Sequence, residues 1–348
     1  SHYRWNNDSG EGEVVMSRLD KLNLRRTDDS IVEAKLLNEA YRNIAQSDSV
    51  KYVIGAMQPI DPEYTKNTYK QAERVRSQLE NRLTDTCELK YQGSVTNDTH
   101  IKAKSDIDLL VIIYKFFTLE NPQVPKSPYK GDPLKDLLSL RKEAEDALDS
   151  AFPQAEVDKT GSKSISIEGG SLTRKVDVVP SNWYNTNKYA ETGSDIYRGV
   201  QILDKSVPTR LANTPFLHNA WIDHKDVNTG GGMRKACRLM KSLKYDSENI
   251  DLSSYDIVSI AFNIPDASLT YPQGGELLIL SACLDYCRQL QMNSALRESI
   301  EVPDKHRKIF CDGHATLLGL NQLTQELEQL ANDVLRENQR SFRRLAEA

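Results

Sequence analysis

The chain has 348 residues, enough to bury a sizeable core in one or two packed units. Its net charge of −5 and pI near 5.8 argue against a long polyanion as the main partner, because such affinity needs many Lys and Arg contacts to phosphates. No run approaches the roughly 18 apolar residues that span a bilayer, and the polar first residues do not resemble a signal peptide. We therefore expect a soluble, cytoplasmic protein with no membrane partner.

The first predicted elements are helices. Residues 30–46 place apolar side chains at helical spacing, and residues 65–83 do the same with one apolar stripe. From Glu88 the pattern changes to short runs rich in β-branched residues, which predict strands over 88–94 and 105–114. A loop with four prolines follows over 118–133.

A further helix is predicted over 134–152, followed by two strands separated by the turn signal Gly169-Gly170. These strands cover 162–169 and 172–180. The rest of the chain is predicted to be mostly helical. Its helices are expected over about 208–228, 233–244, 254–263, 275–292 and 315–345. The layout predicts a mixed α/β (α+β) catalytic lobe over residues 1–205 and a helical lobe over 206–348.

Five cysteines occur at irregular spacing, which indicates reduced thiols rather than a disulfide framework. Cys283, Cys287, Cys311 and His314 are residue types that zinc accepts, in a C-x3-C, C-x2-H arrangement. However, Cys283 and Cys287 lie four residues apart in an apolar, helix-like stretch, where free cysteine behaves as a small hydrophobe. We expect these four residues to hold no metal.

Two aspartates at the start of a predicted strand carry the first chemical signal. Residues i and i+2 of a strand point to the same side, so Asp106 and Asp108 present two carboxylates side by side. Such a pair repels itself unless a cation lies between the two groups. Mg²⁺ takes one or two carboxylates together with phosphate oxygens and water. The pair therefore predicts a Mg²⁺ site, which Mn²⁺ could also fill.

Asp177 lies between valines in a predicted strand, where a lone buried carboxylate would be costly. If that strand lies beside Asp106 and Asp108, the three carboxylates can hold two metal ions, one activating a hydroxyl and one stabilising pyrophosphate. Upstream, Gly93 lets backbone approach a phosphate, and Ser94 supplies a hydroxyl and an N–H donor. Each piece alone is common, but the combination is specific.

This combination resembles the signature of the DNA polymerase β-like nucleotidyltransferase superfamily: Gly-Ser, a spacer, Asp-x-Asp in a strand, and a third Asp. Within it, the chain is similar to the cyclic GMP-AMP synthase-like (cGAS/DncV-like) enzymes, which include the bacterial CD-NTases. The resemblance covers roughly residues 65 to 312. It is carried by GSVTNDTHIKAKSDIDLLVI, KVDVVP, RKACRLMKSL, LSSYDIVSIAF and VPDKHRKIF.

Two features depart from the family pattern. Asn97-Asp98-Thr99 stands where many bacterial relatives have Gly-Thr soon after Gly-Ser, which puts the contacts of that turn in doubt. The zinc ribbon or thumb of the animal synthase is also missing. Together with the acidic pI, this argues against double-stranded DNA as an obligatory activator.

The resemblance implies further nucleotide-binding residues. In the family, a lysine of a Leu-Met-Lys string contacts the donor triphosphate, and here that is Lys241. A following Ser-Tyr places a hydroxyl near phosphate and a ring on the donor base, and here these are Ser254 and Tyr255. From the residues alone, Arg234, Arg238 and Lys241 form a basic helix face, which is usually solvated, and Ser253 or Ser254 would cap a helix.

The function that the resemblance implies is condensation of ATP and/or GTP into a cyclic dinucleotide. An anti-phage signalling role, with regulatory or effector proteins of a defence operon as partners, follows from the resemblance only. One alternative is a nucleotidyltransferase that extends RNA or a small-molecule acceptor, and the acidic charge counts against the RNA version. Another is an inactive nucleotide-binding relative, which would not need three aspartates. The sequence does not indicate which bases are joined or through which linkage.

Overall fold

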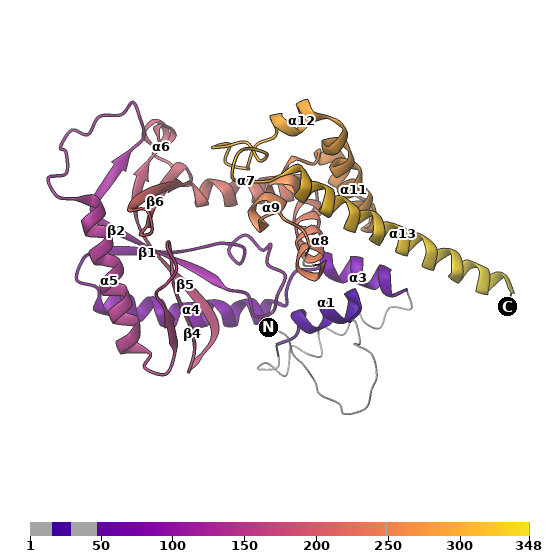
Figure 1. The fold of residues 1–348 in the computed structure, drawn as a ribbon, viewed down its shortest axis with the longest axis horizontal. Helices are drawn as coiled ribbons and strands as arrows, with labels where there is room; N and C mark the ends of the chain where they lie inside the picture. Colours follow the sequence, from indigo (N-terminus) through magenta and orange to yellow (C-terminus); the bar gives the residue numbers. More distant parts are fainter. Residues whose placement is uncertain (1–15, 29–46, 248, 348) are drawn as a thin grey trace.

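The computed structural model describes residues 16–28, 47–247 and 249–347, with side chains up to residue 340. This part of the chain forms a sheet lobe and a helical lobe that lie side by side (Figure 1). The predicted α+β fold is confirmed. The helix predicted over residues 30–46 lies outside the described residues.

The sheet lobe is built on a seven-stranded mixed sheet. The main path is β1-β2-β5-β4-β3, and β6 joins β5 to β7. β2 and β5 pair in parallel, whereas the other described pairs are antiparallel. The strands are β1 (Cys87–Gln92), β2 (Ile107–Leu119), β3 (Glu156–Asp158), β4 (Ile165–Gly169), β5 (Leu172–Asn185), β6 (Arg198–Asp204) and β7 (Thr209–Asn213).

The two faces of this sheet have different coverings, because successive side chains of a strand alternate between faces. On one face, Leu109 and Val111 of β2 pack in a core with α4 and α5. On the other face, Leu110 and Ile112 form a smaller cluster that Phe216 of α7 contacts. Even-numbered residues at the start of β2 therefore face the helical lobe.

The helices of the sheet lobe begin at residues suited to helix starts. Asp61 and Asp132 cap α4 and α5 through their side chains, and each helix has proline at its first position. The elements are α4 (Pro62–Arg82), α5 (Pro133–Ala151), α6 (Asn187–Thr192) and the short 3₁₀ helix η1 (Asp195–Tyr197).

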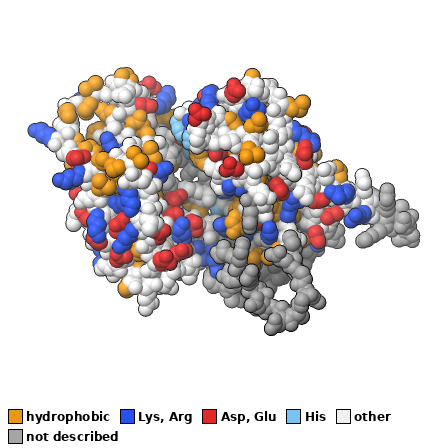
Figure 2. Space-filling model, viewed as in Figure 1, with side chains coloured by type: hydrophobic (Ala, Val, Ile, Leu, Met, Phe, Trp, Pro, Cys, Tyr) orange, Lys and Arg blue, Asp and Glu red, His pale blue; other side chains and the backbone are white. Residues whose placement is uncertain are grey.

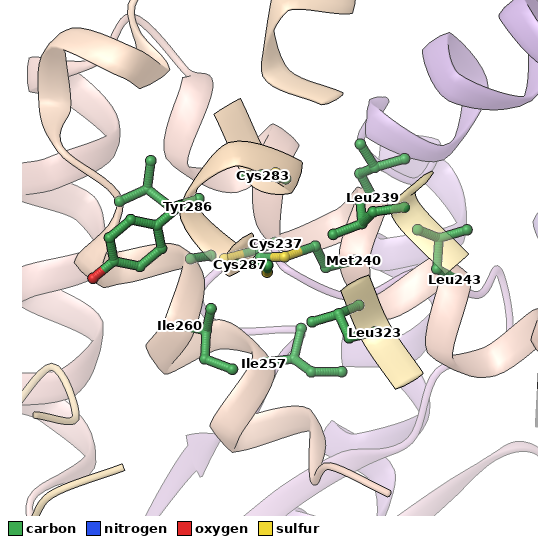
Figure 3. Packing of buried hydrophobic residues seen from close by; sticks show 14 of the residues in the cluster. Cys237, Leu239, Met240, Leu243, Ile257, Ile260, Cys283, Tyr286, Cys287 and Leu323 are labelled. Atoms are coloured by element: carbon green, nitrogen blue, oxygen red, sulfur yellow. The ribbon is translucent and has the colours of Figure 1, made fainter. Parts of the chain in front are cut away.

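The helical lobe combines the first and the last helices of the described chain. Its core contains α8 and α11, where Cys237, Cys283 and Cys287 pack with aliphatic side chains (Figure 3). Its elements are α1 (Arg18–Arg26), α3 (Asp48–Met57), α7 (Pro215–Asn228), α8 (Gly232–Ser247), α9 (Ser254–Asn263), α10 (Asp266–Leu269), α11 (Leu277–Met292), α12 (Ser294–Ser299) and α13 (Leu317–Glu347).

A buried ion pair ties α1 and α3 to α8. Arg25 Nη1 lies 2.5 and 2.7 Å from the two carboxylate oxygens of Asp246, and the Tyr52 hydroxyl donates to Asp246 Oδ2 at 2.6 Å. All three side chains are almost fully buried. Removal of one partner would leave an uncompensated buried charge. This contact therefore holds the N-terminal helices on the helical lobe.

Most predicted elements are confirmed, with one correction. The helix predicted from about residue 208 begins at Pro215, because residues Thr209–Asn213 form β7. β7 is a short, mostly exposed strand paired only with β6 among the described strands. A short strand exposed on an edge has little apolar alternation, so its sequence resembles the polar start of a helix.

The division of the chain into lobes at residue 205 remains a prediction. Two observations bear on the position of the boundary between the lobes. The sheet continues past residue 205 through β7, and α1 and α3 pack in the core of the helical lobe. None of the described helices is long and apolar enough to cross a membrane.

Gly232, the first residue of α8, offers a test of how closely the helical lobe is packed. A Cβ atom there would overlap the carbonyl oxygen of Leu269 in α10. We predict that Gly232→Ala lowers the free energy of unfolding by roughly 2 kcal/mol or more. Gly274→Ala, where φ is +77° but no atom lies within 4 Å, should cost only ~1 kcal/mol. Equal losses in chemical denaturation would contradict this packing.

Candidate active site

The structure brings the three predicted aspartates to one edge of the sheet. Asp108 of β2 and Asp177 of β5 are direct partners in the parallel register. Asp106 immediately precedes β2 and is exposed, whereas Asp108 and Asp177 are half-buried. All three line one cavity. They project from the face that looks toward the helical lobe, on the same side as Leu110.

Lys175 lies among these carboxylates. It precedes Asp177 by two residues in β5, so both side chains point to the same side. Its Nζ lies 3.4 Å from Asp177 and 3.8 Å from Asp106. Burial lowers the pKa of Lys175, but the charges of Asp177 and Asp106 outweigh this effect and leave the pKa raised. Ser166 of β4 donates a hydrogen bond to the other oxygen of Asp177.

The donor set fits a hard divalent cation. Burial, together with the charges of Asp177 and Asp106, raises the pKa of Asp108 to about 7, so an added positive charge would be favourable there. A Cβ at Gly93 would lie 2.5 Å from Asp108 Oδ2, so glycine leaves the carboxylate accessible. Within the described ranges, no group of three His, Cys, Asp or Glu side chains forms a ready metal centre. Phosphate oxygens and water would therefore complete the ligand set, as Mg²⁺ usually requires.

The turn over residues 93–99 follows β1 and carries Ser94. Gly93 has φ of +90°, a conformation that favours glycine. The amide of Thr96 donates to the Gly93 carbonyl at 3.2 Å, and the amide of Thr99 donates to the Ser94 carbonyl at 2.9 Å. These bonds close the turn and leave Ser94 at the cleft, where it lines two cavities.

Lys241 of α8 is buried and lies at the junction of the same two cavities. Its Nζ donates to the carbonyl of Thr99 at 2.7 Å. Burial lowers the pKa of Lys241 to about 8, and the nearby positive charges of Arg238 and Lys102 add to the shift. An ammonium has three donors, so it can hold the turn and also meet an anion.

Ser254 and Tyr255 begin α9 at the cleft. The helix cap is Ser253, which forms a capping box with Asp256, so Ser254 is not needed for this task. Ser254 is exposed and lines both cavities. The Tyr255 ring stacks on His218 of α7 at a centroid distance of 5.1 Å.

Two adjoining cavities form the cleft between the lobes, and Figure 2 shows this hollow with acidic side chains on its sheet-lobe side. One, of about 380 Å³, is lined by residues of the 93–99 turn, α7 and the start of α9. The other, of about 350 Å³, contains the three aspartates together with Lys102 and Lys244. The residues that line both are Ser94, Asp108, Lys241 and Ser254. A larger cavity, of about 460 Å³, lies elsewhere between α4 and the end of α5, and no predicted site residue lines it.

Sequence reasoning missed several residues of the cleft. Lys175 had a usable signal, since the alternation that placed Asp177 also places Lys175 beside it. His218 and Asn219 of α7 had none, because only the fold brings that helix to the 93–99 turn. Asp304 is also unexpected: its carboxylate accepts from Thr214 at 2.5 Å and lies 3.4 Å from the Tyr255 hydroxyl.

The cysteines lie apart from this cleft. Cys283 and Cys287 are core residues of the helical lobe, as their spacing predicted. Burial raises the pKa of both thiols. Cys311 is exposed. The expectation that Cys283, Cys287, Cys311 and His314 hold no metal stays a prediction.

Comparison with known proteins gives clear relatives, although no protein-family model matches the chain. A cyclic dinucleotide synthase CdnE from Yersinia aleksiciae is 40% identical over 309 residues, which cover 86% of this chain and 81% of that protein. A c-di-GMP synthase from Capnocytophaga granulosa is 33% identical over 293 residues, which cover 77% of this chain and 82% of that protein.

The fold comparison agrees with the sequence comparison. The structure of a STING-associated CdnE c-di-GMP synthase from Capnocytophaga granulosa superposes with a TM-score of 0.77 at 29% identity. The match covers 92% of this chain and 98% of that one. Both lobes are therefore shared with that enzyme.

The crowded carboxylates predict a specific pH dependence of stability. Because the pKa of Asp108 is raised in the folded state, its ionisation destabilises the metal-free protein as pH rises from about 4 to 7. We predict that Asp108→Asn, with a chelator at pH 8, is more stable than the wild type by roughly 1 to 3 kcal/mol. At pH 4 the two proteins should be alike. Asp285→Asn, at an exposed position of α11, is the control, and an equal gain there would contradict the explanation.

Proposed function

The chain belongs to the cGAS/DncV-like nucleotidyltransferases, the CD-NTases, and on this premise we propose that its cleft joins two nucleoside triphosphates into a cyclic dinucleotide. The observation that carries the proposal is the register of β2 and β5. It places Asp108, which lines both cavities, beside Asp177, which lines the cavity of the three aspartates, so each cavity can hold one nucleotide next to Asp108.

The reaction consists of two nucleotidyl transfers. A ribose hydroxyl of one nucleotide attacks the α-phosphorus of the other, the bond to the β-phosphate breaks, and pyrophosphate leaves with its electron pair while the hydroxyl loses its proton. A second, intramolecular transfer closes the ring. Asp106, Asp108 and Asp177 would hold a divalent cation, Mg²⁺ or Mn²⁺, which when bound would supply charge stabilisation for the hydroxyl and the pyrophosphate.

The chain's own groups orient the nucleotides. Ser94 offers a hydroxyl and a backbone N–H to phosphate, and Lys241 of α8 offers an ammonium at the same two cavities. Ser254 adds a hydroxyl at the same junction. Tyr255 presents a ring to the cavity of about 380 Å³, where it can stack on a base.

We propose GTP as the preferred substrate, with ATP as the alternative. Two relatives above 30% identity, from Lachnospiraceae and Capnocytophaga, are c-di-GMP synthases. The STING-associated Capnocytophaga structure supports an effector protein that responds to the product. A bacterial anti-phage role in the cytoplasm, with partners from a defence operon, extends the proposal and rests on family membership.

Product formation tests the proposal directly. Purified protein with GTP, ATP or both and Mg²⁺ or Mn²⁺ should release pyrophosphate and form a phosphatase-resistant product without added DNA or RNA. Linkage-specific nucleases then identify the bond. The double variant Asp106→Asn, Asp108→Asn should form none. Undiminished turnover in the double variant would refute the metal site, and activity only with an RNA or small-molecule acceptor would favour that alternative reaction.

Tyr255 and Lys241 should make separable contributions to nucleotide binding. Tyr255→Ala should lose roughly 1 to 3 kcal/mol of affinity for GTP and ATP alike, because a ring stacks on any base. Lys241→Ala should weaken triphosphates far more than guanosine, since an ammonium recognises charge.

Tyr255→Phe and Lys241→Arg are the matched controls for these two substitutions. The first keeps the ring and should bind nucleotides normally, while the second keeps the charge and should retain part of the affinity. Calorimetric affinities for GTP, ATP and guanosine decide the matter. If Tyr255→Ala binds all three as the wild type does, Tyr255 is a packing residue.

A further inference from the structure

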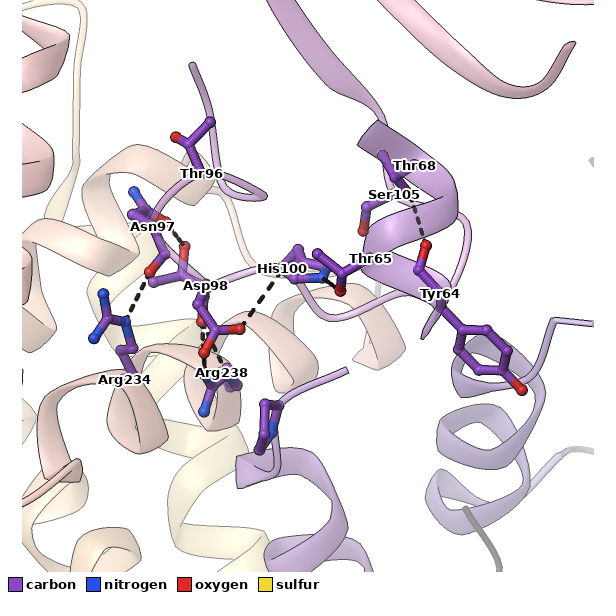
Figure 4. Close-up of polar contacts among 12 residues, drawn as sticks. Tyr64, Thr65, Thr68, Thr96, Asn97, Asp98, His100, Ser105, Arg234 and Arg238 are labelled. Carbon is purple, nitrogen blue, oxygen red and sulfur yellow. Dashed lines mark hydrogen bonds and ion pairs between the residues drawn. The ribbon is translucent and has the colours of Figure 1, made fainter. Parts of the chain in front are cut away.

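The basic face of α8 contacts the Ser94 turn through the backbone. Arg234, Arg238 and Lys241 follow one another along this face at helical spacing. Arg234 donates to the carbonyl of residue 97 and Arg238 to that of residue 98 (Figure 4). Lys241 donates to the carbonyl of residue 99. Three successive carbonyls thus meet three successive cations. This face of α8 was predicted to be solvated or to bind phosphate. In the structure, most of it contacts the turn.

Arg238 makes the most extensive of these contacts. Its Nε and Nη2 lie 3.0 and 2.7 Å from the Asp98 carbonyl oxygen, and Nη2 lies 2.6 Å from the Asp98 carboxylate. Asp98 has φ of +55°, a conformation that costs a residue with a Cβ roughly 1 kcal/mol, although aspartate tolerates it well. The guanidinium is buried and also donates to the Met57 carbonyl at 3.1 Å. Arg238 therefore holds the turn in a conformation that it would not favour alone.

Helix α7 supports the same turn. Asp226 accepts from Arg234 Nη1 at 2.9 Å and so orients the guanidinium toward the turn. Asn219 bonds to the turn itself, with Thr96 at 3.0 Å and Asn97 at 3.2 Å. The turn is thus held by side chains of the helical lobe, whereas the carboxylates of the cleft belong to the sheet.

From this arrangement we infer that Arg238 and Asp98, with Arg234 beside them, are positioning residues. Through them, the helical lobe determines where Ser94 lies. The inference rests on the proposed function, because Ser94 is the residue assigned to phosphate. Gly93 follows Gln92, the register partner of Asp108, so the turn begins at the sheet beside this carboxylate and is held further along by the helical lobe. The contact of α8 with the turn then fixes where a bound triphosphate lies relative to Asp108 and Asp177.

The test uses two conservative variants and their combination. Asp98→Asn keeps a residue that tolerates positive φ but loses the charge that Arg238 meets. Arg238→Lys keeps the charge but loses the planar group that contacts both the carbonyl and the carboxylate. Lys235→Ala on the same helix is the control, because Lys235 pairs with Glu276 and lies over the Tyr271 ring, away from the turn.

Each single variant should raise the KM for GTP about tenfold and leave kcat within about twofold, because a displaced turn loses phosphate contacts made in both the ground and transition states. The KM of the double variant should equal that of the more impaired single variant, because the two residues act through one contact. Independent effects would instead multiply. Lys235→Ala should keep the wild-type KM.

Hydrogen exchange of the nucleotide-free protein gives a readout that does not depend on activity. The amides of Thr96 and Thr99 should exchange faster in Asp98→Asn and Arg238→Lys, while those of α8 stay protected. If Arg238 had only a structural role, through its contact with Met57, Arg238→Lys would lower the melting temperature without changing the KM. Asp98→Asn would then have the KM and the exchange rates of the wild type, and this result would overturn the inference.

The two proposals can fail separately. If the wild type makes no nucleotide product, the proposed function fails, yet the exchange at Thr96 and Thr99 still reports whether α8 holds the turn. If the wild type is active and both variants keep wild-type KM and exchange, the positioning role fails and the function stands. Asp98 is half-exposed in its side chain, at 48%, so Asp98→Asn remains informative even if Arg238→Lys does not fold.

Discussion

The parallel pairing of β2 with β5 is the constraint on which the cleft depends. In this register, Asp108 and Asp177 stand side by side although they come from distant parts of the chain. The repulsion between them would separate two mobile segments. Here both belong to strands that are largely buried, with Leu109 and Val178 packed beneath α4 and α5. The free energy of burying these strands offsets the electrostatic cost, so the sheet can hold like charges together.

Helix α8 links this sheet to the helical lobe because its two faces make different contacts. Met233, Cys237 and Met240 pack in the core of the helical lobe. The other face carries the cations that bond to the 93–99 turn. The buried pair of Arg25 with Asp246 fixes the end of the same helix. The position of the turn is thus connected to the packing of the whole lobe rather than to a local loop conformation.

The sequence predicted those parts of the structure that depend on local pattern. β2 and β5 have long apolar runs, and the spacing of Asp106 and Asp108 places both on one face whatever surrounds them. β7 has no such pattern, so it was missed. The helices over residues 48–57 and 18–26 were not predicted either, because helices as short as these are stabilised by tertiary contacts rather than by propensity.

The candidate site divides in the same way. The three aspartates could be predicted because Asp108 and Asp177 are conspicuous in apolar strands and Asp106 directly precedes the first of these strands. The spacing of Arg234, Arg238 and Lys241 predicted a basic face, yet their partners are backbone carbonyls of residues 97–99, and no side-chain pattern encodes a carbonyl acceptor. His218 lines the cleft, and Asp304 approaches the Tyr255 hydroxyl, only through the arrangement of α7 and the loop before α13.

The ammonium of Lys175 acts as a tethered counter-ion for the carboxylates. A cation in solution must be concentrated enough to bind, whereas the Lys175 ammonium, 3.4 Å from Asp177, is attached to β5 and therefore remains near the carboxylates. A divalent cation bound between Asp106 and Asp177 would therefore exchange with the charge of Lys175 rather than add to it. The lysine would remain attached to β5 at the cleft, where its positive charge would be available to negatively charged phosphates.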